Sequence, residues 1–488
     1  MAGDKTGPAR YVRVGPGEPT IVWKRCQPLP WSAKLMPESE IVLLLSRAQF
    51  ALTIGMHIVL AAFTLGLGLI IVLLEGAWLR YRRSHHWQAL QFWMRVFSLT
   101  VAVGAVSGVV MEFQFGTNWS PFAHKVGGVM GPLMFYEILV AFFLESGLTG
   151  VMLFGMGKIN PKLHFIVTCL VALGAFLSAF WILAANSWMQ TPVGYLRDEH
   201  GIFHARSWIS IVFSPSFPLR FTHMVLASLI ASFCVTAGAS AWRLLKQRAD
   251  RAAKCVMSWS LWLLLIAMPL QIVTGDLQGE KTRDYQPAKL ATIEGSWRRP
   301  PQGEGEPLRL FALPDQKAQV NHAEVAIPTV ASLYLRHNLT GHIKSLSEFQ
   351  PDQQPPVWPV FFAFRVMVGM GLIIFVTSLA ALWLHYRRAL WPRRLMKWVV
   401  GLTPAGFIAL LAGWIVTEVG RQPWTIYGLL RTDQSIAPLS LSTVIFSFTG
   451  IIGMYSLVFG LGIYYFLRLV NSFDSHALSD EISTEASS

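Results

Sequence analysis

The sequence predicts an all-α integral membrane protein, with about nine transmembrane helices in a bundle and one long polar loop outside the membrane. Of its 488 residues, 53% are hydrophobic and only 14% are charged, whereas a soluble globular protein carries roughly 25% charged residues. The apolar residues gather in runs of about 20 or more, each long enough to cross a bilayer. Because lipid offers the backbone no hydrogen-bond partner, each run is expected to be an α-helix.

Nine apolar runs follow one another along the chain, and charged residues separate them. Residues 39–275 hold the first six predicted helices, and residues 358–470 hold the last three. Between them, 276–357 is a polar segment rich in Pro, Gln, Glu and Arg, and 471–488 form a polar tail. The predicted spans are 48–79, 93–113, 130–155, 163–187, 220–243, 256–275, 358–386, 397–418 and 442–468.

Lys and Arg gather in every second loop, and cytoplasmic loops carry such an excess. The loops after residues 79, 155, 243 and 386 are therefore predicted to be cytoplasmic, with the C-terminus. The start of the first span and the loop 276–357 are then periplasmic. The net charge of +13 reflects this topology and does not suggest nucleic-acid binding. The basic residues of the cytoplasmic set are Arg80, Arg82, Arg83, Arg95, Lys158, Lys162, Arg243, Lys246, Arg248, Arg251, Lys254, Arg387, Arg388, Arg393, Arg394 and Lys397.

Residues 1–38 do not fit this topology, because they are basic and would have to lie outside. They contain no apolar stretch, so they are not a secretory signal. We expect them to be disordered or to precede the true translation start, for which Met36 is the candidate. The cysteines form no covalent haem attachment motif and no disulfide framework. They are Cys26, Cys169, Cys234 and Cys255.

Ionisable side chains inside apolar spans are costly and often functional. Haem iron accepts His, Met, Cys or Tyr as axial ligands, and Arg suits the anionic haem propionates. The polar inventory of the spans therefore suits haem. It comprises His57, Glu112, Glu137, Glu145, His223, Arg365 and Glu418, with Met367 as a further possible iron ligand.

Each of these residues also has a simpler interpretation. A lone His can bond across helices, Met367 can be a packing residue, and Glu418 can pair with Arg421 one helical turn on. Two acidic residues two turns apart, Glu137 and Glu145, can border a proton route or bridge helices. The adjacent His85 and His86 lie in a basic loop, where we expect them to be solvated and not to bind metal.

Several ordered motifs between about residues 39 and 470 resemble subunit I of the cytochrome bd-type quinol oxidases, including their cyanide-insensitive branch. The first is the run 45–53 that leads to His57. The others are Met111 to Ser120, Ala141 to Ser146, Ala185 to Gln190, 275–279 with 286–294, and Gly420 to Trp424, which follows Trp414 and Glu418.

The resemblance implies a set of haem ligands. His223 and Met367 resemble the ligands of a low-spin haem b. His57 and Glu418 each resemble the ligand of a high-spin haem. The resemblance leaves open which of the two haems each residue holds. The high-spin pair is haem b and haem d, or haem b alone in a variant without haem d. Residues expected near haem propionates are Arg365, Arg421 and Trp414.

The resemblance also implies a quinol site, a proton path and partners. Lys289 and Glu294 match the family's periplasmic quinol-binding loop. A second membrane subunit is expected, with a possible small single-span one, in a bacterial inner membrane. The substrates would be ubiquinol or menaquinol and O2. Residues implied in proton delivery are Glu112, Glu137, Glu145, Ser178 and Asn186.

The function expected from these features is a terminal respiratory oxidase. It would oxidise quinol on the periplasmic side, reduce O2 to water, and build a proton gradient by vectorial charge separation without pumping. Two alternatives stay open. One is a cytochrome b-type membrane subunit that only relays electrons, and the other is a secondary transporter, although no inverted repeat is evident.

Overall fold

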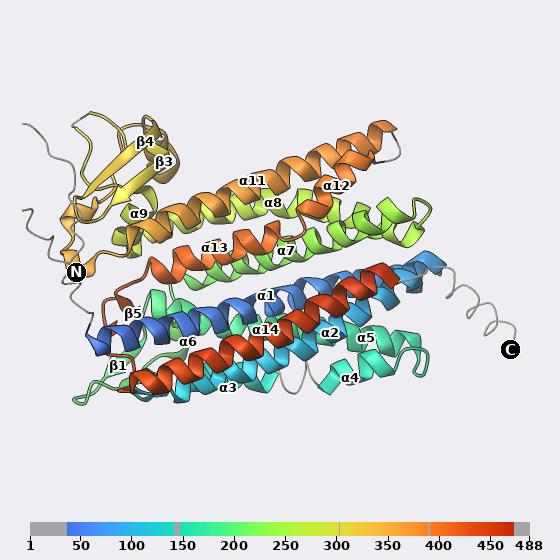
Figure 1. Cartoon of the computed structure of the whole chain (residues 1–488), viewed down its shortest axis with the longest axis horizontal. Coiled ribbons are helices and arrows are strands. Elements are labelled where there is room, and N and C mark those ends of the chain that lie inside the picture. Colours follow the sequence, from blue (N-terminus) through green and yellow to red (C-terminus); the bar gives the residue numbers. More distant parts are fainter. Residues whose placement is uncertain (1–36, 141–146, 302, 389–390, 473–488) are drawn as a thin grey trace, which may run out of the picture.

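A computed structural model describes residues 37–140, 147–301, 303–388 and 391–472. Long helices run side by side along the longest axis of the molecule (Figure 1). They are α1 (Glu38–Tyr81), α2 (Ser84–Gly116), α5 (Pro161–Gln190), α7 (Phe217–Lys246), α8 (Arg251–Tyr285), α11 (Val357–Arg388) and α14 (Leu441–Ser472). The shorter helices are α3 (Ser120–Val140), α4 (Gly147–Phe154), α6 (Trp208–Val212), α9 (Pro287–Glu294), α10 (Val330–Arg336), α12 (Arg393–Gly401) and α13 (Ala405–Val419), with 3-10 turns at Leu346–Glu348 and Pro351–Gln353.

Eight helical segments in the described part of the chain are long and apolar enough to cross a membrane. Each overlaps one predicted span, which confirms the helical membrane fold. The eighth predicted span is α12 and α13 together. The third predicted span, 130–155, covers the second half of α3 and all of α4, and residues 141–146 between them lie outside the described residues. The ninth crossing therefore stays a prediction.

The helices are longer than the apolar runs that predicted them. α1 begins at Glu38 and α8 continues past residue 275 to Tyr285. The predicted limits at 48 and 275 were therefore too narrow for the helices. Apolar runs mark the part of a helix that lies in hydrocarbon, whereas the backbone hydrogen bonds can continue into water.

Three short antiparallel strand pairs add to the helices. They are β1 (Tyr195–Arg197) with β2 (Phe203–Ala205), β3 (Leu308–Asp315) with β4 (Val320–Ile327), and β5 (Trp424–Ile426) with β6 (Leu430–Arg431). All three lie at the end of the bundle where α1 starts, as does α9 (Figure 1). The purely helical prediction missed these hairpins, because four of the strands have only two or three residues and β3 and β4 lie in a segment that was read as a polar loop.

Helix α7 lies in the middle of the bundle, where it packs against α1, α5, α8, α12 and α13. Its residues from Ile230 to Ala241 are all buried and mostly small. Small side chains let helix backbones approach closely inside a membrane. At the contact with α1, a Cβ on Gly66 would collide with Ser232, whose Oγ donates to the carbonyl of Ala62 at 3.3 Å.

A buried polar cluster ties α1 to α5 near the opposite end of the bundle. Glu75 is 1% exposed and accepts from Nδ1 of His164 at 2.6 Å and from Oγ1 of Thr168 at 2.7 Å. Nε2 of His164 lies 2.8 Å from the carbonyl oxygen of Met152 in α4. Every polar atom of this pair therefore has a partner, as buried polar groups require.

Candidate functional site

His57, on α1, faces α2. Its Nδ1 lies 2.9 Å from Oγ of Ser107, and that hydroxyl donates to the carbonyl of Gly104 at 2.8 Å. A Cβ added to Gly108 would lie only 3.2 Å from Cε1 of the imidazole. One ring nitrogen is thus held from α2, which leaves Nε2 to face a ligand. A hydrogen bond of this kind to the other ring nitrogen fixes the orientation of a metal-binding histidine.

His223 and Met367 also face glycines on neighbouring helices. A Cβ on Gly275 of α8 would lie 3.3 Å from Cε1 of His223, and one on Gly413 of α13 would lie 3.1 Å from Sδ of Met367. Both ring nitrogens of His223 are near α8, with Nε2 at 3.1 Å from Nε2 of Gln271. The three candidate His and Met ligands therefore each pack closely against a neighbouring helix at a residue without a side chain.

Glu418 ends α13 inside a dense polar cluster. Its Oε2 pairs with the guanidinium of Arg421 at 2.5 Å, while Oε1 accepts from Asn186 at 3.1 Å and from Gln190 at 3.3 Å. The side chain of Asn186 in turn accepts a hydrogen bond from Arg220 of α7. The ion pair with Arg421 is the simpler interpretation of Glu418; both of its oxygens have partners here, and its role as an iron ligand stays a prediction.

Three buried donors around this cluster have no partner in the described part of the chain. They are Nε1 of Trp414 and the Nε and NH1 groups of Arg421, which is only 5% exposed. Buried guanidinium groups normally meet an anion or an acceptor. Unpaired donors beside Glu418 are what a bound group with carboxylates would satisfy, so Trp414 and Arg421 fit the prediction that they lie near haem propionates.

Arg365 is placed differently. Its guanidinium donates to the carbonyls of Arg309, Ile293 and Phe361 at 2.5–2.9 Å and lies over the ring of Phe361. It therefore ties α11 to the backbone of α9 and β3. Its role at a propionate stays a prediction.

Lys289 lies on α9 with only 5% of its surface exposed. Its Nζ donates to Oε1 of Gln190 at 2.7 Å, and Gln286 donates to the same oxygen at 3.0 Å. Burial, followed by the nearby charge of Arg220, lowers the pKa of Lys289 well below its usual range. Gly420 makes this approach possible, because a Cβ there would lie 2.9 Å from Cγ of Lys289. The lysine is therefore part of the polar cluster around Glu418.

Glu294, at the end of α9, belongs to a second cluster. Its Oε1 accepts a hydrogen bond of 2.5 Å from the hydroxyl of Tyr334 on α10, and its Oε2 is buried without a partner among the described residues. Burial raises the pKa of Glu294, and its hydrogen bond with Tyr334 acts in the opposite direction. Nearby, Arg309 pairs with Glu306 at 2.9 Å. The two residues predicted to bind quinol therefore lie on one helix, and their side chains belong to two different polar clusters.

Two of the predicted proton-path residues meet directly. Ser178 of α5 donates to Oε1 of Glu137 on α3 at 2.9 Å, and Glu112 of α2 interacts electrostatically with Glu137. Asn186 lies elsewhere, beside Glu418. Glu145 falls outside the described residues. The described members of the predicted path therefore form two groups along α5.

Four further residues complete these clusters without having been predicted from the sequence. Gln190 and Gln286 lie within the quoted motifs, and Arg220 lies at the start of the predicted span 220–243. Tyr334 had no signal in the sequence, because a tyrosine in a polar segment is unremarkable until the fold brings it to Glu294.

Residues 45–473 match the family model described as "Cytochrome bd terminal oxidase subunit I". The chain belongs to that family. As a member it is an enzyme subunit, an oxidoreductase of aerobic respiration in the bacterial cytoplasmic membrane, and the family implies haem cofactors. Membership rules out the transporter and favours an oxidase over an electron relay.

Individual cytochrome bd relatives agree over nearly the whole chain. The chain is 33% identical over 454 residues to "Cytochrome bd ubiquinol oxidase subunit 1" of Bacillus subtilis, which covers 90% of this chain and 95% of that one. It is 31% identical over 480 residues to "Cytochrome bd-II ubiquinol oxidase subunit 1" of Escherichia coli, covering 85% and 93%. Its fold is similar to the bd oxidase structure from Geobacillus thermodenitrificans, with a TM-score of 0.81, 26% identity, and coverage of 89% and 99%.

Proposed function

We propose that this chain oxidises quinol at the end of the bundle that carries α9 and, with its partner subunits, reduces O2 to water. The observation that carries the proposal is the pair of buried clusters on the two sides of α9. One holds Glu294 with an unpaired oxygen, and the other joins Lys289 to Glu418 through Gln190 and Asn186. A proton acceptor and a candidate iron ligand are thereby linked through one short helix.

The proposed haem set follows the residues that fit it. His223 and Met367 would hold a low-spin haem b, while His57 and Glu418 would each hold a high-spin haem, either b and d or b alone. Haem iron supplies one-electron transfer and, where one axial face stays open, oxygen chemistry. Glycines 108, 275 and 413 let three of these ligands pack closely against a neighbouring helix. Arg421 and Trp414 would pair with propionates through their unpaired donors.

At the quinol site, the chain's own residues handle protons. A quinol releases two protons as it is oxidised, and a carboxylate within hydrogen-bond reach can accept one. Glu294 is suited to this because Tyr334 holds one of its oxygens and leaves the other free of partners. Burial lowers the pKa of Lys289, and its Nζ is suited to form a hydrogen bond with a quinol oxygen. The relatives named above are ubiquinol oxidases, so ubiquinol is the first substrate to test, before menaquinol.

On the opposite side, protons must reach the site of oxygen reduction. Glu137, held by Ser178, and Glu112 form a polar group within the membrane-spanning region, where ionisable residues are costly. We assign them to proton delivery, together with Glu145. Protons released outside and consumed from inside would build a gradient without a pump.

The orientation rests on charge. The loops with the strongest basic bias, α1–α2, α7–α8 and α11–α12, lie at the end of the bundle opposite α9, β3 and β4 (Figure 1). The basic end is assigned to the cytoplasm. The start of α1 and the segment that carries Lys289 and Glu294 are then periplasmic. We expect a second membrane subunit and allow for a small single-span one.

The substitution Glu294→Gln tests the quinol part of the proposal in the purified complex. Ubiquinol-driven oxygen consumption should fall at least about 10-fold, since a positioned general base contributes roughly 100-fold or more. Carbon monoxide should still bind the reduced complex. Glu304→Gln, on an exposed residue of the same segment, is the matched control and should turn over normally. Unchanged turnover in Glu294→Gln would exclude Glu294 as the proton acceptor, and failure to bind carbon monoxide in the unmodified complex would favour an electron relay.

A further inference from the structure

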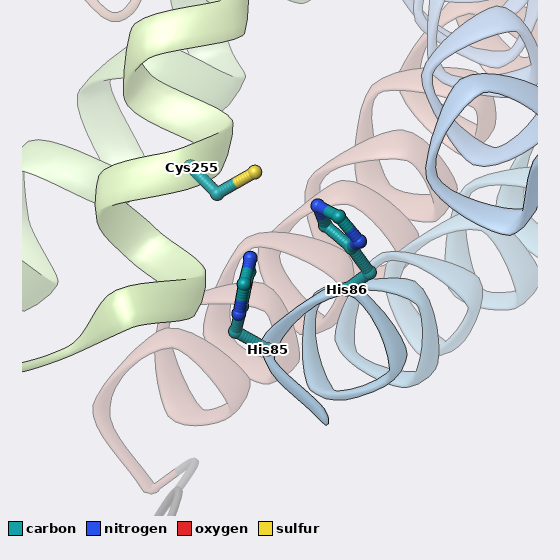
Figure 2. Close-up of side chains that lie close together, drawn as sticks. All are labelled: His85, His86 and Cys255. Carbon is teal, nitrogen blue, oxygen red and sulfur yellow. The ribbon is translucent and has the colours of Figure 1, made fainter. Parts of the chain in front are cut away.

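Three side chains with metal-binding atoms meet between α2 and α8, at the end of the bundle opposite α9. They are His85 and His86, in the first turn of α2, and Cys255, in the second turn of α8. One ligand atom from each residue lies within 4.8 Å of the other two. Figure 2 shows the two imidazoles and the sulfur directed into the same space between the helices.

His86 provides a second, independent observation. It is 5% exposed, and its Nδ1 is buried without a hydrogen-bond partner among the described residues. The rings of Tyr81, His85 and Trp259 lie around it, and none of them bonds this nitrogen. The sequence prediction that both histidines are solvated was therefore wrong for His86, because α8 packs over the start of α2 and covers it. A buried polar nitrogen without a partner calls for a ligand or a water.

We propose that His85, His86 and Cys255 bind one zinc(II) or copper(I) ion. Two imidazoles and a thiolate are the donors that these d10 ions prefer, whereas Mg²⁺ and Ca²⁺ require oxygen ligands. In such a site the ligand atoms lie about 3.5 Å apart, given metal–ligand bonds of about 2.0–2.3 Å. Small side-chain rotations bring three atoms that already lie within 4.8 Å to that spacing.

The surroundings of the three side chains act on both the ion and the thiol. Arg83 interacts electrostatically with both Cys255 and His85, and Arg251 interacts with His85. These positive charges oppose a bare cation, and burial favours the thiol over the thiolate, so the bound ion itself must displace the thiol proton. Copper(I) with one thiolate is neutral overall, and zinc(II) with one thiolate carries a single positive charge. Copper(I) would be satisfied by three ligands, whereas zinc(II) would take a water as its fourth.

A bound ion would join the start of α2 to the second turn of α8. These two helices are far apart in the sequence and pack directly against each other. The ion would hold the basic end of the bundle closed, and its removal would loosen that end without touching the residues assigned to quinol or oxygen. The site is independent of the proposed function.

Elemental analysis of the purified complex tests the proposal. The complex is incubated with zinc(II) or with copper(I) under reducing conditions, desalted, and analysed for zinc, copper and iron. After incubation with the ion that the site prefers, we expect one zinc or copper ion per chain to remain through desalting. The affinity for this ion should be at least about 10-fold weaker in Cys255→Ser and in His86→Gln. The iron content reports whether each variant still assembles.

Cys169→Ser is the matched control, since Cys169 is another half-buried thiol in a membrane helix and is not part of this group. It should retain the metal. A competition titration with a chromophoric chelator gives the affinity of the unmodified complex even if a variant fails to assemble. Absence of stoichiometric zinc and copper from the unmodified complex in both arms overturns the proposal, as does equal binding by Cys255→Ser.

Discussion

The hydroxyl of Tyr334 donates a hydrogen bond of 2.5 Å to Oε1 of Glu294, while Oε2 of the same carboxylate is buried without a partner in the described part of the chain. One carboxylate oxygen is thereby fixed, and the other is free to accept a proton. The arrangement makes Tyr334 a positioning residue for the proposed proton acceptor, although it lies 40 residues further along the chain.

Tyr334→Phe should therefore slow quinol oxidation and move its pH dependence. The phenol hydrogen bond stabilises the carboxylate, so its loss raises the pKa of Glu294 further. Glu294 accepts a proton only as a carboxylate, and turnover is lost as the pH falls through its pKa. The acidic limb of the turnover profile should thus move to higher pH in Tyr334→Phe. A steady-state profile measured with ubiquinol checks this, and an unmoved limb would limit Tyr334 to a structural role.

The acidic limb itself should depend on Glu294. Because burial raises the pKa of this carboxyl, wild-type turnover should begin to fall at a higher pH than it would for an exposed glutamate. Glu294→Asp should keep a limb, whereas Glu294→Gln should lose it along with most of its activity. If the residual activity of Glu294→Gln kept the wild-type limb, another group would be titrating.

Met367→Leu should convert the low-spin haem to a five-coordinate one or shift its potential, and quinol oxidation should slow. The swap keeps the volume nearly constant, so the fold should survive at a cost below about 1.5 kcal/mol. The matched control is Met370→Leu, one turn further along α11, where the methionine packs against the apolar core. Optical and electron paramagnetic resonance spectra distinguish the two variants. A normal low-spin signal in Met367→Leu would remove Met367 from the ligand set.

Glu137→Gln should slow oxygen reduction while quinol can still reduce the haems. Ser178→Ala should have a smaller effect in the same direction, since it removes only the 2.9 Å hydrogen bond that orients the carboxylate. Stopped-flow reoxidation of the reduced complex by O2 measures the step directly. Exposed Glu199 gives the control Glu199→Gln. Wild-type reoxidation in Glu137→Gln would contradict its assignment to proton delivery.

The buried pair of Glu75 and His164 should matter for stability. Glu75→Leu leaves His164 and Thr168 without their partner, and breaking a buried pair costs about 3–5 kcal/mol. The variant should lose its haem absorbance at a lower temperature than the wild type. Thr168→Val removes the hydroxyl but keeps the contact between His164 and Glu75, so its stability should fall between those of Glu75→Leu and the wild type. Equal thermal stability of all three proteins would show that the pair is not needed to join α1 to α5.

Features that depend on composition along one helix could be predicted from the sequence. The apolar runs located eight spanning segments, and the polar exceptions inside them drew attention to His57, His223 and Glu418. Features that depend on how helices meet could not. Nothing near Tyr334 in the sequence points to Glu294, and nothing near His86 indicates that α8 covers it. The burial of Lys289 likewise depends on Gly420, more than a hundred residues away.

The proposed oxidase function depends most on haem iron being held between these helices. Purified complex should be examined by a reduced-minus-oxidised spectrum and pyridine haemochrome analysis. We predict low-spin haem b together with high-spin haem, and a change on adding carbon monoxide to the reduced sample. A correctly assembled complex without haem absorbance or bound iron would contradict the account.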